Sequence, residues 1–501
     1  MLHKFIFSII LLFLCRCAIL TEQVTVTQGM SNFPAGLDPA RNFDVNDIQI
    51  YAQIYETLLT LDNDFKTLRP HLATHWDVSD DAKCYTFYLR PGVTFHDNSN
   101  FTAHSAKYAF ERQIKLHHSF PIFENIDSFI VLDSLILQIK LKVPHAIFLY
   151  ALASPIGLVA ISPMALQKYG DDIAYHPVGS GPFRFHEAIK DDKIVLKAYS
   201  NYWHGGNNID YIIFKFYNDN YQREQSIERD NVDILYAISS YYVDRLKWLG
   251  TIDFYIQKPA NVIYLGFNNK STPFNDPTLR KAIFKAINVP KFVHNLTRGN
   301  AEIARGPIPT ALLNYRELEQ DKYDYLQAKQ LLKKAGYADS LQVKLFYPEM
   351  AFSRHTILEF LKTELAKVGI SIKVTRFNSW EALDRAIVYD SSQMFIDSYG
   401  SEVIGDPWNF LYSLFYSNSP QNRMNYHNAI IDSLLDQCTR EFNNEQRVFL
   451  YKRIISHILH DTPAVFLYHV TSHFAYNKNK IKELFVNPYE IIQYQSISLN
   501  E

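Results

Sequence analysis

The histidines are the first residues whose spacing could support chemistry. The chain has 18 of them; His71 and His75 stand four residues apart, and His117 and His118 are adjacent. On a helix, residues four apart share one face, where two imidazoles could bind a metal ion or the iron of haem. The sequence contains no Gly-x-Ser-x-Gly, no His-Glu-x-x-His and no phosphate-binding loop. Protease and nucleotide chemistry therefore lack a supporting motif.

A second candidate is Asp406, within the segment Ile404-Gly-Asp-Pro-Trp-Asn-Phe410. Asp followed by Pro before an apolar run is typical of a helix N-terminus, where the carboxylate accepts hydrogen bonds from backbone N–H groups and proline occupies the first helical position. We therefore predict a helix over 408–415. Whether Asp406 also contacts a ligand stays open on this pattern alone.

The first 20 residues have the layout of a secretory signal peptide. Lys4 precedes the apolar run from Phe5 to Leu14, which is too short to span a bilayer. We predict a mature chain outside the cytoplasm, in the periplasm or anchored by lipid to the outer side of the membrane. Lipidation would need Cys15 or Cys17 as the first mature residue, and neither follows the usual small residue.

Two cysteines, Cys84 and Cys438, remain in the predicted mature chain. An oxidising compartment permits a disulfide between them. Their distance in sequence neither supports nor excludes the bond, so a disulfide and two buried thiols both stay open.

Hydrophobic periodicity predicts short strands and helices in alternation, which indicates α/β lobes. Helices become more frequent in the second half. The predicted strands are 85–90, 134–141, 193–198, 211–216, 341–346 and 370–375, and the predicted helices are 103–114, 277–287, 325–335, 353–368, 430–442 and 445–459.

Composition narrows the functional class. Lys and Arg number 50 against 52 Asp and Glu, and this balance argues against affinity for nucleic acid through phosphate neutralisation. The length predicts about three domains. Aromatic residues make up 15% of the chain and Gly only 17 residues, which indicates either a ligand cavity lined by aromatic rings or a compositional bias of the genome.

Blocks of residues in a fixed order then give a closer assignment. Single blocks such as Gly179-Ser-Gly-Pro-Phe183 are weak evidence, but many in order are strong. The blocks include Gly36-Leu-Asp-Pro39, Ile54-Tyr-Glu-Thr-Leu58, Leu72-Ala-Thr-His-Trp76, Leu89-Arg-Pro-Gly-Val-Thr-Phe-His-Asp97, Asn201-Tyr-Trp203, Leu279-Arg-Lys-Ala-Ile283 and Asp461-Thr-Pro463. With these blocks in this order, the chain resembles the extracytoplasmic solute-binding proteins of family 5, the peptide-binding proteins of ABC transporters.

The resemblance implies a periplasmic-binding-protein-like α/β fold (type II, cluster C) with two hinged lobes and an inserted third lobe. Crossing segments near Asn261 and Tyr476 would form the hinge, and closure would capture the ligand. The implied division is signal peptide 1–20, lobe I 21–48, 177–261 and 478–501, lobe II 49–176, and lobe III 262–477.

The resemblance also implies binding residues. In the family, a carboxylate in a Gly-Asp-Pro segment holds the peptide's amine, and this role falls on Asp406. Trp408 either walls the cleft or packs inside lobe III, and Tyr399 replaces a frequent cleft tryptophan. Dipeptide-binding relatives use an arginine near 345–354; Arg354 is the candidate here, although the position nearest that arginine looks apolar. In the block that holds His71 and His75, the family's residues are structural, which argues against a metal.

We therefore expect the non-catalytic substrate-binding component of a peptide-type ABC importer, a monomer that delivers peptides to permease subunits in the inner membrane. No resident cofactor or metal is expected. One alternative is the same fold with haem, a cationic antimicrobial peptide or another small solute as ligand. A secreted hydrolase is a third hypothesis that no motif supports.

Overall fold

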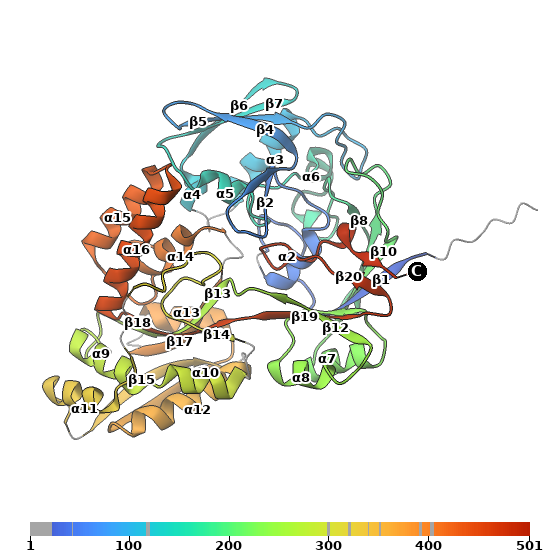
Figure 1. Ribbon diagram of the computed structural model, residues 1–501. Coiled ribbons are helices and arrows are strands. Elements are labelled where there is room, and N and C mark those ends of the chain that lie inside the picture. The colour runs from blue at the N-terminus through green and yellow to red at the C-terminus, as the bar shows by residue number, and fades with distance from the viewer. Residues whose placement is uncertain are drawn as a thin grey trace, which may run out of the picture.

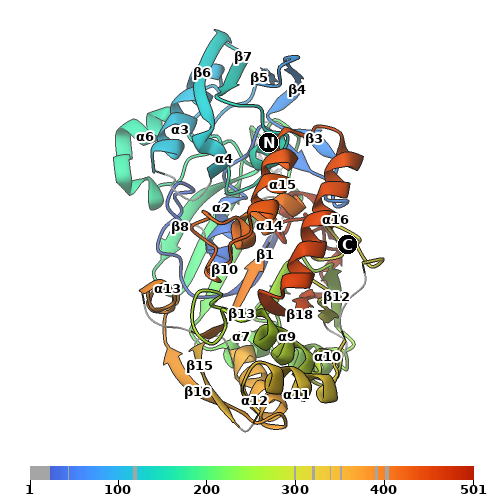
Figure 2. The ribbon, with the colours of Figure 1, turned by 90° about the vertical axis from the view of Figure 1, so that its left-hand side faces the viewer.

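The computed structural model describes residues 23–42, 44–116, 121–297, 301–318, 322–338, 340–349, 352–389, 393–400 and 405–500. The predicted signal peptide and the pair His117 and His118 lie outside these ranges. Each of the three main sheets anchors one lobe, and Figures 1 and 2 show how the lobes are arranged.

Lobe I is built on a seven-stranded sheet that collects distant parts of the chain. Its order is β12-β19-β11-β1-β10-β9-β8, with β1 parallel to β10 and β11 and the other pairs antiparallel. The strands are β1 (Thr25–Ser31), β8 (Phe183–Ile189), β9 (Lys193–Ala198), β10 (Tyr211–Tyr217), β11 (Ile234–Leu235), β12 (Ile252–Gln257) and β19 (Ser472–Asn477), accompanied by α2 (Val45–Tyr51), α7 (Asn220–Glu228) and α8 (Ser240–Leu246).

Lobe II is built on the antiparallel sheet β4-β5-β7-β6, with helices beneath it (Figure 1). Its elements are β2 (Leu59–Leu61), β3 (Leu68–Pro70), β4 (Ala73–Val78), β5 (Cys84–Leu89), β6 (Ile126–Asp133), β7 (Ile136–Leu141), α3 (Ala103–Leu116), α4 (Pro121–Glu124), α5 (Phe148–Leu152), α6 (Pro163–Tyr169) and the 3-10 helix η1 (Gly170–Ala174).

Lobe III is built on the mixed sheet β14-β18-β13-β17-β15-β16 and holds most of the long helices. Its strands are β13 (Asn261–Phe267), β14 (Ala301–Ile303), β15 (Leu341–Pro348), β16 (Ile370–Phe377), β17 (Met394–Gly400) and β18 (Ala464–Val470). Its helices are α9 (Pro277–Ala286), α10 (Val289–Thr297), α11 (Tyr325–Lys334), α12 (Phe352–Ala366), α13 (Trp380–Tyr389), α14 (Pro407–Phe415), α15 (Ala429–Arg440) and α16 (Asn444–Asp461).

The chain passes between lobes I and III twice, side by side. The first crossing is residues 258–260, between β12 and β13, and the second is Thr471, between β18 and β19. The second crossing therefore precedes the expected position near Tyr476, because β19 pairs with β11 and β12 in lobe I. The tail then adds β20 (Ile481–Glu483), η2 (Tyr494–Ser496) and β21 (Ser498–Leu499). The full division into lobes stays a prediction.

The predicted elements correspond closely to the observed ones. Strand 193–198 matches β9, helix 277–287 matches α9, and helix 408–415 lies within α14. Along β10, buried Ile212, Phe214 and Phe216 alternate with partly exposed residues, the pattern from which the strand was predicted. The alternative that His71 and His75 share one helix face is wrong, because His75 lies on β4, where its ring stacks on Tyr88 with centroids 4.1 Å apart.

Both cysteines of the predicted mature chain are free. Cys84 begins β5 in lobe II, whereas Cys438 is buried in α15 of lobe III. Burial raises the pKa of the Cys438 thiol to about 12. The disulfide alternative is therefore wrong, and Cys438 acts as a small apolar residue in its helix.

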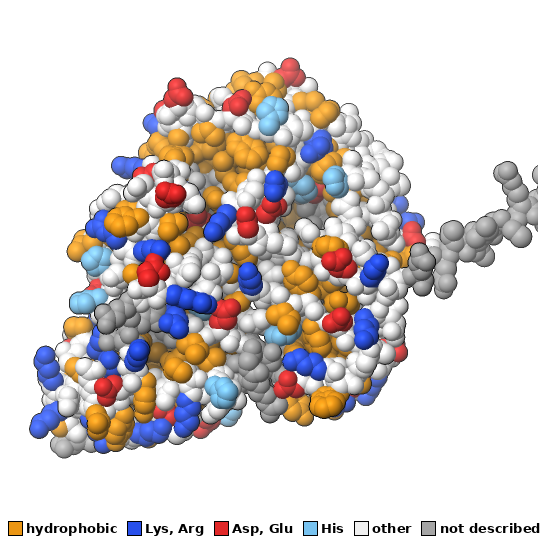
Figure 3. Space-filling model, in the orientation of Figure 1, with side chains coloured by type: hydrophobic (Ala, Val, Ile, Leu, Met, Phe, Trp, Pro, Cys, Tyr) orange, Lys and Arg blue, Asp and Glu red, His pale blue; other side chains and the backbone are white. Residues whose placement is uncertain are grey.

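Charged side chains of both signs are interspersed over the face shown in Figure 3. This distribution matches the near balance of 50 basic and 52 acidic residues. Among the described helices, none combines the length and the apolar character that a membrane crossing needs.

The turn at Gly179 and Gly181 joins lobes I and II by close approach of two backbones. A Cβ on Gly179 would stand 2.0 Å from the carbonyl oxygen of Ile54, and one on Gly181 would stand 2.5 Å from that of Gln53. Neither glycine has a positive φ. The glycines are therefore needed for space and not for a left-handed backbone conformation.

We expect Gly179→Ala to lower the free energy of unfolding by about 1–3 kcal/mol, because the added methyl group forces two backbones apart. Urea unfolding followed by circular dichroism measures the change. Gly250→Ala is the matched control, since nothing lies within 4 Å of its Cβ position. Equal stability of the two variants would contradict the close-approach explanation.

Candidate functional site

Asp406 caps helix α14. Its Oδ1 accepts a hydrogen bond from the backbone N–H of Trp408 at 2.8 Å and another from the hydroxyl of Tyr451 at 2.7 Å. Pro407 occupies the first helical turn. The capping interpretation of the sequence is therefore confirmed, and it follows from local chemistry.

The same carboxylate is buried with an incomplete set of partners. Asp406 is 5% exposed, and the nearest cation is Arg447, whose Nε lies 4.0 Å from Oδ2. The terminal nitrogens of Arg447 donate instead to the carbonyl of Glu441 and the side chain of Asn444. Within the described residues, no group donates a hydrogen bond to Oδ2 of Asp406. Oδ2 of Asp406 thus has the 4.0 Å ion pair with Arg447 and no hydrogen bond from the described residues, which leaves it able to accept one.

Burial raises the pKa of Asp406 above its usual value. The positive charge of Arg447 and the hydrogen bonds from Tyr451 and Trp408 work in the opposite direction without cancelling it. A cation that reached Oδ2 would reverse the shift, because an opposite charge favours the ionised form.

The first turn of α14 lies where lobe III meets lobe II. Leu61 of β2 stands 2.4 Å from the point that a Cβ on Gly405 would occupy. The backbone N–H of Ala146 in lobe II donates to the carbonyl oxygen of Thr439 in α15, with N and O 2.7 Å apart. These contacts place the start of α14, which Asp406 caps, beside an interface between lobes II and III; Figure 1 labels this helix.

Trp408 spans that interface. Its ring packs edge-to-face on His145 of lobe II with centroids 5.1 Å apart, and it stacks on Tyr412 of its own helix at 4.5 Å. The residue is 4% exposed, and its Nε1 has no hydrogen-bond partner in the part of the chain that the structure describes. Trp408 therefore packs against residues of both lobes, and its role at a cleft wall stays a prediction.

Tyr399 packs behind α14. It lies on β17, its hydroxyl donates to Ser413 at 2.8 Å, and its ring meets Phe410 edge-to-face at 5.2 Å. Arg354 lies in the first turn of α12, and its side chain is outside the described part of the structure. The structure therefore brings Asp406, Trp408 and Tyr399 together around one helix and leaves Arg354 as a prediction.

Comparison with known proteins identifies the scaffold. The model of the middle region of the bacterial extracellular solute-binding proteins, family 5, matches residues 67–422. This is more than two thirds of the chain. The chain belongs to this family. Its members are solute-binding proteins found outside the cytoplasm, as the resemblance in the sequence implied.

Similar proteins cover almost the whole of this solute-binding protein. The glutathione-binding protein GsiB of Pectobacterium atrosepticum is 28% identical over 481 residues, covering 93% of this chain and 92% of GsiB. The periplasmic binding protein DppA of Helicobacter pylori, in complex with the peptide STSA, has a TM-score of 0.82 and 26% identity, covering 95% of this chain and 98% of DppA. NikA of Brucella suis, in complex with Fe(III)-EDTA, has a TM-score of 0.87 at 20% identity, covering 95% and 100%. The predicted fold class is confirmed.

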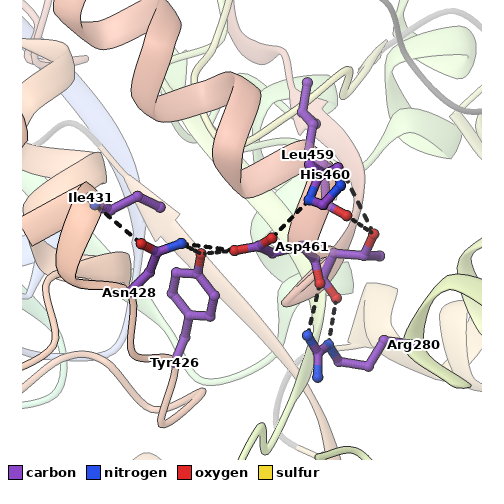
Figure 4. A network of polar contacts seen from close by, with 8 residues as sticks. Arg280, Tyr426, Asn428, Ile431, Leu459, His460 and Asp461 are labelled. Carbon is purple, nitrogen blue, oxygen red and sulfur yellow. Dashed lines mark hydrogen bonds and ion pairs between the residues drawn. The ribbon is translucent and has the colours of Figure 1, made fainter. Parts of the chain in front are cut away.

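Several blocks of the family pattern are explained by polar networks that need no ligand. Figure 4 shows one in lobe III: Asp461 accepts from Tyr426, Asn428 and His460, while Arg280 donates to the backbone carbonyls of Asp461 and Thr462. This network fixes the end of α16 against the start of α9. The blocks that contain Arg280 and Asp461 therefore specify the scaffold.

A second network, around Glu56, was missed by sequence reasoning. Glu56 is 4% exposed and accepts from Ser180 at 2.7 Å, Tyr202 at 2.8 Å and Trp203 at 3.1 Å. His71 Nε2 lies 3.3 Å from the same carboxylate. The blocks were visible in the sequence, but nothing in it shows that residues 124 and 147 positions away converge on one carboxylate. Within the described ranges, no three metal-ligating side chains form a site.

The pKa of Asp406 predicts how stability depends on pH. Because the pKa of Asp406 is raised in the folded state, this carboxyl ionises at lower pH in the unfolded chain. The folded state therefore loses stability as pH rises from about 4. Between pH 4 and pH 8, we therefore expect the protein's free energy of unfolding to fall relative to that of Asp406→Asn. Ligand-free urea titrations at both pH values measure it. A shift in favour of the aspartate would show that its pairing with Arg447 outweighs burial.

Proposed function

We propose that this solute-binding protein captures short peptides between lobe III and the other two lobes and delivers them to the permease of an ABC importer. The observation that carries the proposal is the available Oδ2 of Asp406, a buried acceptor beside an interface between lobes. The peptide's ammonium group would bind there. The relatives support a peptide, since GsiB binds glutathione and DppA was solved with the peptide STSA.

An ammonium group suits this position for an electrostatic reason. A charge-assisted hydrogen bond is roughly twice as strong as a neutral one, and its strength increases when water is excluded. Oδ1 already holds the helix and Tyr451, so ligand binding need not disturb the cap. Every peptide with a free N-terminus presents such a group, which fits a receptor for peptides of varied sequence.

Capture would proceed by movement about the two crossings. The two crossing segments, residues 258–260 and Thr471, are short and adjacent. Lobe III would therefore turn as a body against lobes I and II. Contacts between lobes II and III, such as that of Trp408 with His145, would form on closure. A closed receptor presents surfaces of both lobes at once, and a permease could recognise this geometry.

The proposal is tested by combining a variant with a modified ligand. Isothermal titration compares Ser-Thr-Ser-Ala with its N-acetylated form on the protein and on Asp406→Asn. We expect acetylation to weaken binding to the protein about 10–100-fold, as for a lost charged hydrogen bond. On Asp406→Asn, which keeps a good capping residue, acetylation should make little difference. Glutathione serves as a second probe.

Asp276→Asn is the matched control. Asp276 caps α9 in the same manner, with Pro277 in the first turn and a hydrogen bond of 2.7 Å from Thr278. Its substitution should leave both affinities unchanged. An equal acetylation penalty on the protein and on Asp406→Asn would remove the assignment of Asp406. A Soret band on addition of haem, with no binding of either peptide, would favour the haem alternative over peptides.

A further inference from the structure

Next to the Asp406 segment lies a cavity of about 370 Å³, formed by lobe I, lobe II and the C-terminal tail. Its size is within the range of small-molecule sites. Tyr489 and Thr60 line it. The hydroxyl of Tyr489 is 3.8 Å from the point where a Cβ on Gly405 would stand, and Leu61, next to Thr60, is 2.4 Å from the same point. The cavity and the Asp406 segment therefore share a wall.

Arg90 is held on the wall of this cavity with its outer edge unoccupied. Its guanidinium lies over the ring of Trp203, 4.2 Å from the centroid, and its Nε donates to the carbonyl of His71 at 3.0 Å. Its backbone N–H donates to the carbonyl of Leu72. Among the described residues, none accepts a hydrogen bond from the two terminal nitrogens of Arg90, and none forms an ion pair with it.

The surroundings fix Arg90 without neutralising that edge. Among the described residues of the wall, Glu56 is the one with an acidic side chain. Its oxygens already accept hydrogen bonds from Ser180, Tyr202 and Trp203. Trp203 thus joins the two charged groups: its N–H binds Glu56 and its face carries Arg90. A guanidinium held by stacking and by its Nε presents two parallel N–H donors, the geometry that matches a carboxylate.

We propose that Arg90 binds the terminal carboxylate of the captured peptide. This inference rests on the proposed function, and it supplies the partner for the end of the ligand that Asp406 does not bind. It also gives the ligand class a second requirement, since a peptide would need a free C-terminus. Arg354, the candidate from the sequence, would then have no part in holding that carboxylate.

The test uses Ser-Thr-Ser-Ala and its C-terminal amide, titrated calorimetrically into the protein and into Arg90→Gln. We expect amidation to weaken binding to the protein about 10–100-fold. On Arg90→Gln the two ligands should bind with equal affinity. If Arg90 had only a scaffold role, Arg90→Gln would bind both ligands more weakly by the same factor and would keep the amidation penalty. That result would overturn the inference. So would the absence of a penalty on the unmodified protein.

Two further variants keep the result interpretable if Arg90→Gln folds poorly. Arg90→Lys retains a charge but not the fork, and it should retain only part of the amidation penalty; the full penalty would overturn the role of the fork. Arg69→Gln is the control, since Arg69 lies in the same lobe on β3, exposed and paired with Asp62. It should keep the full penalty. If the protein binds neither ligand, the proposed peptide function fails, whereas binding without an Arg90-dependent penalty defeats only this inference.

Discussion

A buried carboxylate with one available oxygen is the constraint around which the candidate site is arranged. Removing Asp406 from water is costly, and the helix N-terminus, Tyr451 and Arg447 offset only part of that cost. If lobes II and III close over it as proposed, less water can reach the remaining oxygen. A cation from the ligand would replace the stabilisation of the carboxylate by water that closure removes. Ligand binding and lobe closure are therefore expected to favour each other, as a ligand that prefers one of two conformations must.

The capping geometry could be predicted from the sequence because it is local. Asp406, Pro407 and the apolar run after them are neighbours, and the preference of each residue for its position does not depend on the rest of the fold. Strand β10 could be predicted for the same reason, since the alternation of buried and partly exposed residues along its seven positions shows that one face of the strand is buried. Local patterns of this kind account for the agreement in element boundaries.

Contacts between distant segments could not be predicted in this way. The spacing of His71 and His75 fits a helix, but pairing of β4 with β5 determines their surroundings. Gly179 is explained by Ile54, more than a hundred positions earlier, and Glu56 is explained by residues from the next lobe. The position of β19 likewise follows from its pairing with β12 within the sheet of lobe I. Each case depends on which segments meet, and composition or periodicity does not record that.

The proposed positions of Asp406 and Arg90 on different lobes would couple ligand length to closure. Asp406 belongs to lobe III and Arg90 to lobe II, so a ligand that bound both would connect the two lobes whose relative movement we propose. An extended peptide spans about 3.3 Å per residue. A ligand too short would reach one charge without the other, and one too long would hold the lobes apart. The separation of the two charged groups in the closed form would thus select peptide length, while side chains between the ends contribute less.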